Sequence, residues 1–305
     1  MSEEPFTQLP SQLFNAAASS STSYSFVNSE VLGQRAIVIH NFCSPEECDA
    51  VVDYMQSIDR PPAEEGEVVM TSAGSKVEYR NHKRALAQSE EVAEILLKRV
   101  HPILASIDQA VVHCREDNCK GFIQDGIGMR GAWAVHSINP MFRLAKYDPL
   151  GHLGPHCDGD RIVDPIDHRS LKTFMVYLND DYEGGATSFS HDHDLYIDPV
   201  RGIWCSPPEA IHSRLKAQKG DCLIFDHKIL HEGQQVLSGH KYIIRSEIMY
   251  KKKAQRCQSD DDLKMEQAVR LFNEGISLEE QHRVDDAIKL YRRAYKLCPA
   301  LEGVM

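Results

Sequence analysis

Residues 142–160 read FRLAKYDPLGHLGPHCDGD and carry the strongest local pattern in the chain. An alternating apolar segment comes first, which is typical of a half-buried strand, and Pro and Gly then interrupt it. His156 and Asp158 follow, two positions apart. On a strand, side chains at this spacing share one face, so both can reach a metal ion about 2 Å away. Two ligands do not make a site, and we expect a third from a distant strand.

The third ligand is predicted within residues 217–250, AQKGDCLIFDHKILHEGQQVLSGHKYIIRSEIMY. Gly220 is expected to make a turn, residues 223–225 to form a buried strand, and His231 to emerge at its end. Two imidazoles and one carboxylate on one side of an ion form a facial triad, which leaves positions open for an oxidant and a bidentate 2-oxo acid. The sequence therefore predicts an iron(II) centre held by His156, Asp158 and His231.

A 2-oxo acid with a second carboxylate also needs a cation to receive it. Lys241 lies ten residues beyond His231 at the start of an alternating strand, and Arg245 shares its face. A buried Lys or Arg without an anion is costly, so two of them in an apolar barrel imply negative ligands. We favour Lys241 for the far carboxylate, and we expect Arg245 to contact the other end of the co-substrate or a polar substrate group. The alternative, exposed strand residues in salt bridges, stays open for both.

Short apolar or alternating segments recur from about residue 129 to 250, between Gly, Pro, Asn and Asp. The predicted strands include MFRLAKY, LKTFMVYLN, ATSFS, GIWCS, CLIFD and KYIIRSEIMY. Such a series favours a jelly roll whose two sheets face each other across a pocket. Upstream, a strand at 35–42 feeds a helix at 44–58 with Ser44 as its cap, and a second amphipathic helix covers 89–104 and ends near Pro102. The predicted fold class is α+β, with helices before and after the jelly roll.

Three regions are predicted along the chain. Residues 1–30 are polar and lack periodicity, so we expect a disordered leader, and a Pro- and Glu-rich loop is expected at 60–75. Residues 31–253 form the main domain. Residues 260–305 are expected to form a helical hairpin, whose small residues are spaced as in a tetratricopeptide unit. A lone repeat cannot bury its own face, so it should pack on the main domain or on a protein partner.

Composition restricts the partners and the compartment. The formal net charge of −11 disfavours nucleic acid, because a phosphate backbone would be repelled. No apolar run is long enough to cross a bilayer, and the start of the sequence does not resemble a signal peptide. The nine cysteines are scattered, and Cys157 lies inside the metal motif, which favours reduced thiols. We expect a cytoplasmic or nuclear protein that binds no membrane.

The strings at 142–160, 171–189 and 219–250 together resemble the iron(II)- and 2-oxoglutarate-dependent oxygenases of the prolyl 4-hydroxylase type, over roughly residues 33 to 250. The resemblance implies a double-stranded β-helix, with His156, Asp158 and His231 as iron ligands and Lys241 as the anchor for 2-oxoglutarate. It also implies that Tyr147 hydrogen-bonds the same carboxylate. The expected cofactors are Fe(II), 2-oxoglutarate and O2, with ascorbate as reductant. The chain departs from the animal enzymes at Glu247, where an aromatic residue is usual.

The resemblance leaves more than one function open. Hydroxylation of a prolyl residue of a protein, with release of succinate and CO2, is the leading hypothesis. The alternatives are a hydroxylase of a free amino acid or other small molecule, and a scaffold or sensor that recruits partners through the helical repeat. A rival metal site, His191 to Asp194 in SHDHD, lies on a predicted loop and has no distant partner.

Overall fold

The computed structural model describes residues 7–15, 22–58, 67–70, 76–114, 129, 131–191, 195–253 and 260–303. The chain divides into two compact units. The first comprises Met1–Val100, Ser137–Gly159 and Leu171–Ile248, and the second comprises His101–His136, Asp160–Ser170 and Met249–Met305. The described part is mostly sheet, with a pair of helices near the C-terminus.

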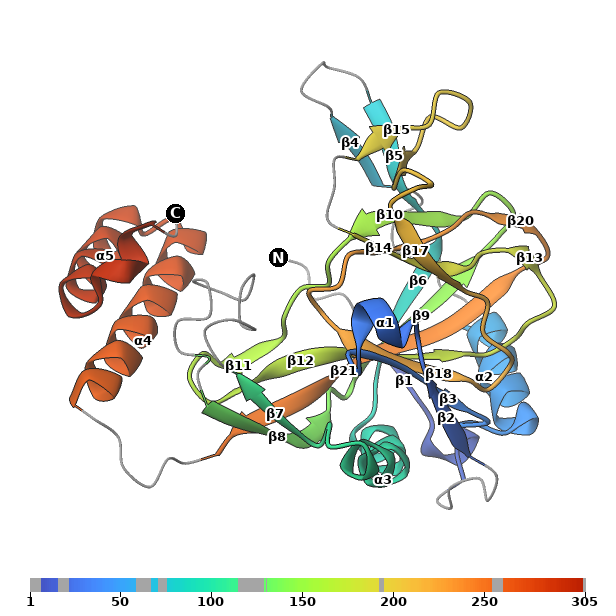
Figure 1. Cartoon of the computed structure of the whole chain (residues 1–305), viewed down its shortest axis with the longest axis horizontal. Coiled ribbons are helices and arrows are strands. Elements are labelled where there is room, and N and C mark those ends of the chain that lie inside the picture. The colour runs from blue at the N-terminus through green and yellow to red at the C-terminus, as the bar shows by residue number, and fades with distance from the viewer. Residues whose placement is uncertain are drawn as a thin grey trace. The chain divides into compact units, whose positions relative to one another are not determined.

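Two sheets build the first unit (Figure 1). The larger follows the order β1 (Thr7–Gln8), β6 (Lys83–Gln88), β9 (Met141–Tyr147), β21 (Lys241–Lys252), β12 (His168–Tyr177), β18 (Cys222–Asp226), β3 (Ala36–His40) and β2 (Ser23–Phe26). The smaller follows the order β17 (Ile211–Leu215), β14 (Thr187–Ser190), β19 (His231–Gly233), β10 (His152–His156), β5 (Lys76–Asn81) and β4 (Glu67–Met70). Two short pairs complete it, β13 (Glu183–Gly184) with β20 (Val236–Ser238) and β15 (Tyr196–Ile197) with β16 (Trp204–Cys205).

The sheets face each other across an apolar core. Phe189 of β14 packs in one cluster with Phe225 of β18 and Ile243 of β21, and all three side chains are buried. The strands predicted at 141–147 and 222–226 coincide with β9 and β18, because each is an apolar run bounded by turn residues. Gly220 makes the turn before β18 with φ +86°, and a Cβ there would lie 2.3 Å from the carbonyl oxygen of Cys43. Only glycine fits this position.

Helices α1 (Ser29–Leu32), α2 (Pro45–Ser57) and α3 (Glu90–Ser106) accompany the sheets. The helix start predicted at Ser44 is confirmed: Ser44 and Glu47 form a reciprocal capping box, and Pro occupies the first turn of α2. The buried guanidinium of Arg99 then pairs with Glu47. Helix α3 does not end near Pro102 as predicted but runs on to Ser106. A proline forfeits one backbone hydrogen bond, and the burial of Leu104 in the last turn offsets that loss.

Parts of the predicted leader are ordered. Residues 7–15 contain β1 and the turn η1 (Ser11–Leu13), and β2 lies within 22–30. Leu9 and Phe14 are almost fully buried, and the backbone of Asn15 is held between Glu47 and Arg99. Burial of two apolar side chains therefore anchors a segment whose composition alone indicated disorder. Of the loop predicted at 60–75, the structure describes only β4.

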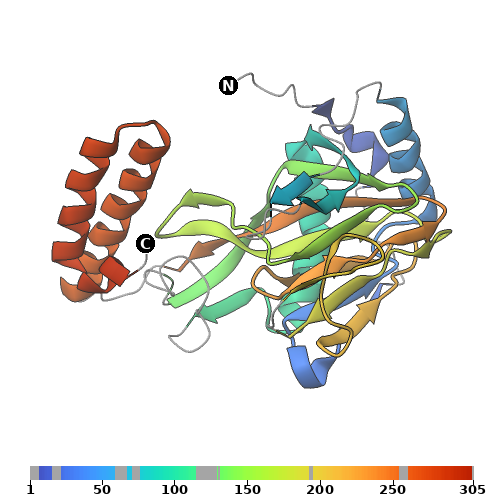
Figure 2. The same ribbon diagram turned by 90° about the horizontal axis from the view of Figure 1, so that it is seen from above.

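The second unit contains β7 (Val111–Cys114), most of β8 (Gly131–Ile138), with which β7 pairs, and β11 (Ile162–Asp164). It also contains α4 (Asp260–Glu280), α5 (Val284–Leu297) and the turn η3 (Pro299–Gly303). Figure 2 shows α4 and α5 side by side as a hairpin, as the sequence predicts. Gly275 permits this close approach, because a Cβ there would lie 2.5 Å from the ring of Tyr291.

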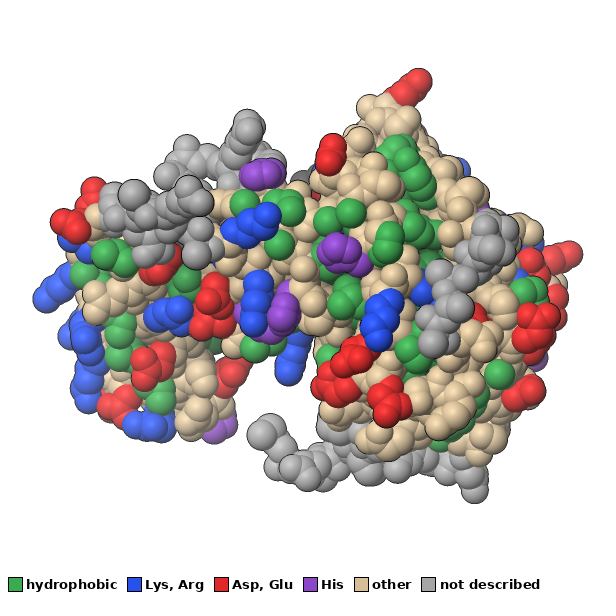
Figure 3. All heavy atoms as spheres, turned by 90° about the horizontal axis from the view of Figure 1, so that it is seen from below, with side chains coloured by type: hydrophobic (Ala, Val, Ile, Leu, Met, Phe, Trp, Pro, Cys, Tyr) green, Lys and Arg blue, Asp and Glu red, His purple; other side chains and the backbone are tan. Residues whose placement is uncertain are grey.

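The surface carries no simple charge pattern on the face drawn in Figure 3, where basic and acidic side chains are interspersed. None of the described helices is long and apolar enough to cross a membrane. The cysteines that the structure describes with their side chains are free thiols.

Candidate metal centre

The structure brings the three predicted metal ligands together. His156 on β10 and His231 on β19 are direct partners in the antiparallel ladder, and their ring centroids lie 4.2 Å apart. Asp158 follows β10, with its carboxylate oxygens 3.4 Å from Nε2 of His156 and 3.7 Å from Nε2 of His231. One ligand atom from each residue lies within 4.8 Å of the others, a spacing that suits a shared ion. Among the described residues no other group of three His, Cys, Asp or Glu side chains converges in this way.

Both imidazoles are oriented for metal binding. Nδ1 of His156 lies 2.9 Å from the carbonyl oxygen of Gly154, and Nδ1 of His231 lies 2.9 Å from that of Ile229. A carbonyl oxygen only accepts, so each Nδ1 carries the proton and each Nε2 keeps its lone pair for a cation. Burial, reinforced by the neighbouring His156, lowers the pKa of His231 to about 4. The His231 ring is therefore neutral near pH 7.

A buried hydrogen-bond chain holds Asp158. Its backbone N–H donates to the carbonyl oxygen of His227 at 2.9 Å, and its Oδ2 accepts from the hydroxyl of Thr173. Since that hydroxyl has one proton to give, Nδ1 of His227, 3.0 Å away, must donate to Thr173. Burial lowers the pKa of His227 to about 3, so its ring stays neutral. The chain from His227 through Thr173 fixes the rotation of the metal-facing carboxylate.

Arg245 is the second group on this carboxylate. Its guanidinium pairs with Oδ1 of Asp158. Burial by itself would raise the pKa of Asp158, but the charge of Arg245, together with His231 and His156, holds it well below its usual value. A carboxylate has about four lone-pair positions, so Asp158 can keep Thr173 and Arg245 and still bind a cation.

Lys241 ends in a buried pocket lined by aromatic rings. Its side chain is 3% exposed, and its ammonium lies 5.3 Å from the ring centroids of both Tyr147 and Tyr177. The ammonium donates to the carbonyl oxygen of Gly185 at 2.7 Å, and no carboxylate of the described residues pairs with it. Burial lowers the pKa of Lys241 to about 7. The pocket therefore offers a desolvated cation to an anionic ligand.

Tyr147 is positioned beside this cation. It is the ladder partner of Lys241, and the ring of His82 stacks on it at 4.5 Å. Burial raises the pKa of Tyr147 to about 12, so its hydroxyl stays protonated and can donate. The hydroxyl of Tyr177, the other ring beside Lys241, lies 2.7 Å from that of Thr187.

Residues 142–246, which include all three metal-facing residues, Lys241 and Arg245, match the family model described as the 2OG-Fe(II) oxygenase superfamily. This segment belongs to the 2OG-Fe(II) oxygenase superfamily. The oxygenase is also 26% identical over 227 residues to prolyl 4-hydroxylase 1 of Arabidopsis thaliana, in a match that covers 68% of this chain and 66% of that relative.

Solved structures give remote matches to the oxygenase. The viral collagen prolyl hydroxylase of Paramecium bursaria Chlorella virus-1, in its 2OG complex, is 20% identical with a TM-score of 0.41, covering 72% of this chain and 97% of that one. A Pseudomonas putida prolyl-4-hydroxylase is 13% identical with a TM-score of 0.39, covering 75% of this chain and 96% of that one.

The superfamily implies Fe(II), 2-oxoglutarate and O2, and the residues of the oxygenase fit these groups. Two imidazoles and one carboxylate are the donor set that suits non-haem Fe(II) with open positions. The buried ammonium of Lys241 and the protonated hydroxyl of Tyr147 suit a carboxylate.

Sequence reasoning missed Thr173 and His82 and left His227 without a defined role. Thr173 lies inside the apolar run LKTFMVYLN, so a polar residue at a fully buried strand position was the available signal. Nothing in the local sequence links His82 to Tyr147. Of the rival motif SHDHD, Asp192, His193 and Asp194 lie outside the described residues, and His191 lies 4.9 Å from the ring of His212.

Proposed function

We propose that the oxygenase binds Fe(II) through His156, Asp158 and His231, binds 2-oxoglutarate through Lys241 and Tyr147, and hydroxylates a prolyl residue of a protein. The observation that carries this proposal is the buried ammonium of Lys241, which has no carboxylate partner among the described residues and belongs to the same unit as the three converging metal-facing side chains. A metal centre alone has many uses, but a desolvated cation in the same fold calls for a carboxylate.

Each of these residues has a defined task. Iron(II) with 2-oxoglutarate supplies the activation of O2, and the overall reaction turns 2-oxoglutarate and O2 into succinate, CO2 and one hydroxyl group on the substrate. His156 and His231 present Nε2 to the ion, and Asp158 supplies the negative charge. Lys241 and Tyr147 orient the distal carboxylate of 2-oxoglutarate, while the surrounding aromatic rings exclude water.

Arg245 has a separate task in this proposal. Because its guanidinium already pairs with Asp158, it is less available than Lys241 to anchor the distal carboxylate. We assign it to the metal end of 2-oxoglutarate, where it orients Asp158 and meets the negative charge of the keto-acid carboxylate.

The choice of prolyl substrate rests on the name of the Arabidopsis relative, and the match spans about two thirds of that protein. Purified protein loaded with Fe(II), 2-oxoglutarate and ascorbate is expected to form succinate with proline-containing peptides and to add the mass of one oxygen atom to proline. Peptides with alanine in place of proline are the matched control. Equal turnover of both sets would point to another residue, and turnover of free amino acids alone would point to a small-molecule hydroxylase. Binding of iron and 2-oxoglutarate without turnover would support the scaffold or sensor alternative.

We further propose that the two sheets form a double-stranded β-helix and that α4 and α5 form a tetratricopeptide-like unit. The two facing sheets support a double-stranded β-helix, and the small-residue contact between α4 and α5 supports a tetratricopeptide-like unit that docks a protein partner. We also propose a cytoplasmic or nuclear location, consistent with the free cysteines that the structure describes.

A further inference from the structure

A hollow lies on the face of the smaller sheet that points away from the metal centre. Its volume is about 270 Å³, and β15, β16 and the residues between them form one of its walls. Side chains alternate along β19, so Glu232 points to the face opposite His231. In agreement, Phe189, the ladder partner of His231, lies in the apolar core, whereas Glu232 lines the hollow.

Two residues that line the hollow, Arg214 and Glu232, lie in register on either side of a third strand. Ser188 on β14 is the ladder partner of Arg214 on β17 and of Glu232 on β19. The Glu232 side chain is buried, and its two oxygens accept hydrogen bonds from the Ser188 hydroxyl at 3.0 Å and from the Ser206 backbone N–H at 3.1 Å. Both donors are neutral, and Glu232 forms no ion pair with any cation that the structure describes. A buried carboxylate without a cation is unfavourable, so the hollow has an uncompensated negative charge.

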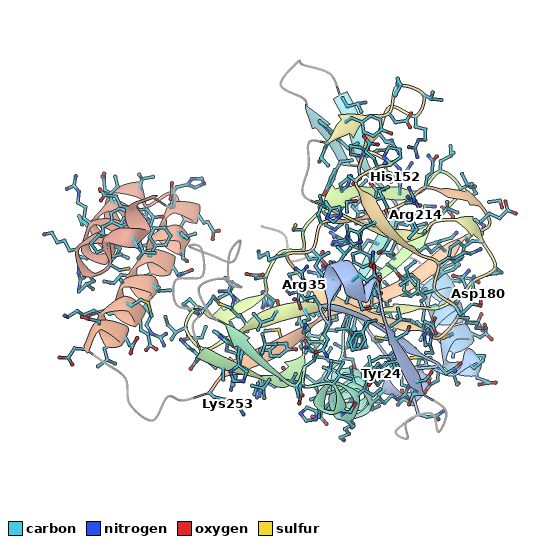
Figure 4. The ribbon with its side chains drawn as sticks, in the orientation of Figure 1. Tyr24, Arg35, His152, Asp180, Arg214 and Lys253 are labelled. Carbon is cyan, nitrogen blue, oxygen red and sulfur yellow. The ribbon has the colours of Figure 1, made fainter. Side chains whose placement is uncertain are left out.

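The hollow also contains polar groups that have no partner within the described ranges of the chain. Arg214 is exposed, and no carboxylate or other acceptor of the described residues bonds its guanidinium. The hydroxyl of Ser206 is buried and makes no hydrogen bond to any group that the structure describes. Arg201, by contrast, is paired with Asp198. Arg214 and His152, both labelled in Figure 4, line the hollow.

The ladder fixes the spacing between the backbones of Arg214 and Glu232. Since neighbouring strands lie about 4.8 Å apart, the backbones of Arg214 and Glu232 are about 10 Å apart across Ser188. Tyr196 and Trp204 add aromatic surface to the wall. A ligand that satisfies these groups has a cationic end, a carboxylate within a few ångströms of it, and an aliphatic stem that packs on the rings.

We propose that this hollow binds a basic amino-acid unit, with its guanidinium or ammonium side chain on Glu232 and a carboxylate on Arg214. Two sources share this chemistry: a free basic amino acid, and a peptide with a basic residue next to an acidic one. The binding uses none of the residues assigned to iron or 2-oxoglutarate, so it is independent of the proposed reaction.

The test uses the full chain without added iron. The chain has two tryptophans, Trp133, which is fully buried, and Trp204 in the wall of the hollow. A ligand-induced change in tryptophan fluorescence is therefore assigned to the hollow if Trp204→Phe removes it. Calorimetry supplies the dissociation constants. The probes are L-arginine, L-citrulline, and the N-acetylated Arg-Glu dipeptide amide with its citrulline-Glu counterpart.

We expect saturable binding of an arginine probe. Its citrulline counterpart should bind about tenfold or more weakly, because only the side-chain charge differs between the two. If L-arginine alone binds, the ligand is a free amino acid. If the dipeptide amide binds more tightly, it is a peptide. Equal binding of arginine and citrulline probes, or no saturable binding of any probe, overturns the proposal. This comparison uses the unaltered protein, so it does not depend on the folding of a variant.

Two variants locate the contact. Glu232→Gln keeps both hydrogen bonds if its amide oxygen faces the Ser206 N–H and its amide nitrogen faces the Ser188 hydroxyl. This variant should lower the affinity for the arginine probes by about tenfold. Arg214→Met should weaken L-arginine by a similar factor, with little effect on Nα-acetyl-L-argininamide, which has no carboxylate. Glu209→Gln and Lys216→Met change the same charges at exposed positions outside the hollow, and they should leave binding unaltered. If the two control variants lose as much affinity as Glu232→Gln and Arg214→Met, the probes bind outside the hollow.

Discussion

The ammonium of Lys241 donates a hydrogen bond to the carbonyl oxygen of Gly185 at 2.7 Å, in a pocket where no described carboxylate pairs with it. A single neutral acceptor does not compensate a buried cation, which is why burial lowers the pKa of Lys241 to about 7. The fold thus holds a cation in an unfavourable state that an anionic ligand would relieve.

The first prediction concerns replacement of this cation. Lys241→Met should weaken 2-oxoglutarate by roughly 3 to 5 kcal/mol, by analogy with loss of one partner of a buried ion pair. Isothermal titration of 2-oxoglutarate into Mn(II)-loaded protein measures the change. Lys146→Met is the matched control, because Lys146 precedes Tyr147 on β9, points to the other face and pairs with Asp148. If Lys241→Met binds normally while Arg245→Met does not, the two cations have exchanged roles.

The same cation predicts a dependence on pH. The ligand requires the ammonium form, which the ligand-free protein loses as pH rises through about 7. Affinity for 2-oxoglutarate should therefore be constant below that pH and fall by up to about tenfold per unit above it. Titrations from about pH 6 to about pH 9 test the slope. Lys241→Arg should flatten the profile, since a guanidinium stays charged throughout. A flat profile in the unaltered protein would show that another group controls binding.

The metal-facing residues could be predicted because their signals are local. His156 and Asp158 are two positions apart, a spacing that predicts neighbouring ligands although β10 ends at His156 and Asp158 lies just beyond it. His231 follows an apolar run after a turn that requires glycine at position 220. The alternation in KYIIRSEIMY likewise places Lys241 and Arg245 on one face. What the sequence left open was which of the two is already neutralised, because the Arg245 contact with Asp158 joins residues far apart in the chain.

Other features depended on tertiary contacts and could not be predicted. The leader was expected to be disordered from its composition, yet Phe14 is buried and Arg99 holds the carbonyl oxygen of Asn15. The hollow around Glu232 forms only when the segment from Tyr196 to Ser206 folds back on β19, and no periodicity encodes that contact.

The hydrogen bond from the Thr173 hydroxyl to Asp158 gives a further prediction. Thr173→Val removes the donor to Asp158 at nearly constant volume, so affinity for Fe(II) or Mn(II) should fall by about 10- to 100-fold. Thr173→Ser keeps the hydroxyl and should restore most of the affinity. Metal titration, and the d–d spectrum of the Co(II)-substituted protein, report the site directly. Equal metal affinity in the Val and Ser variants would mean that the hydroxyl does not position the carboxylate.

Removal of a ligand should be most informative at His231. His231→Ala deletes one imidazole but leaves Asp158 paired with Arg245, whereas Asp158→Ala would also leave that guanidinium buried without its partner. We expect His231→Ala to abolish turnover and the thermal stabilisation by added metal, while the metal-free melting temperature changes little. His212→Ala is the control, because this imidazole contacts Ser213 and Asn28 and not the three metal-facing residues. A full metal-induced shift in His231→Ala would exclude it as a ligand.

The helical hairpin provides a test of packing that does not involve the metal. A Cβ at Gly275 would lie 2.5 Å from the ring of Tyr291, so Gly275→Ala must displace that ring or separate α4 from α5. Such overpacking costs about 1 to 3 kcal/mol, and it should appear as faster proteolysis of the hairpin. Tyr291→Leu in the same chain should recover part of the loss, because the smaller side chain makes room for the methyl group. Ser277→Ala, two residues away on α4, is the control. Since none of the three metal-facing residues lies in α4 or α5, metal affinity should be the same in all these variants. Parallel loss of metal binding would show that the hairpin and the metal centre unfold as one cooperative unit.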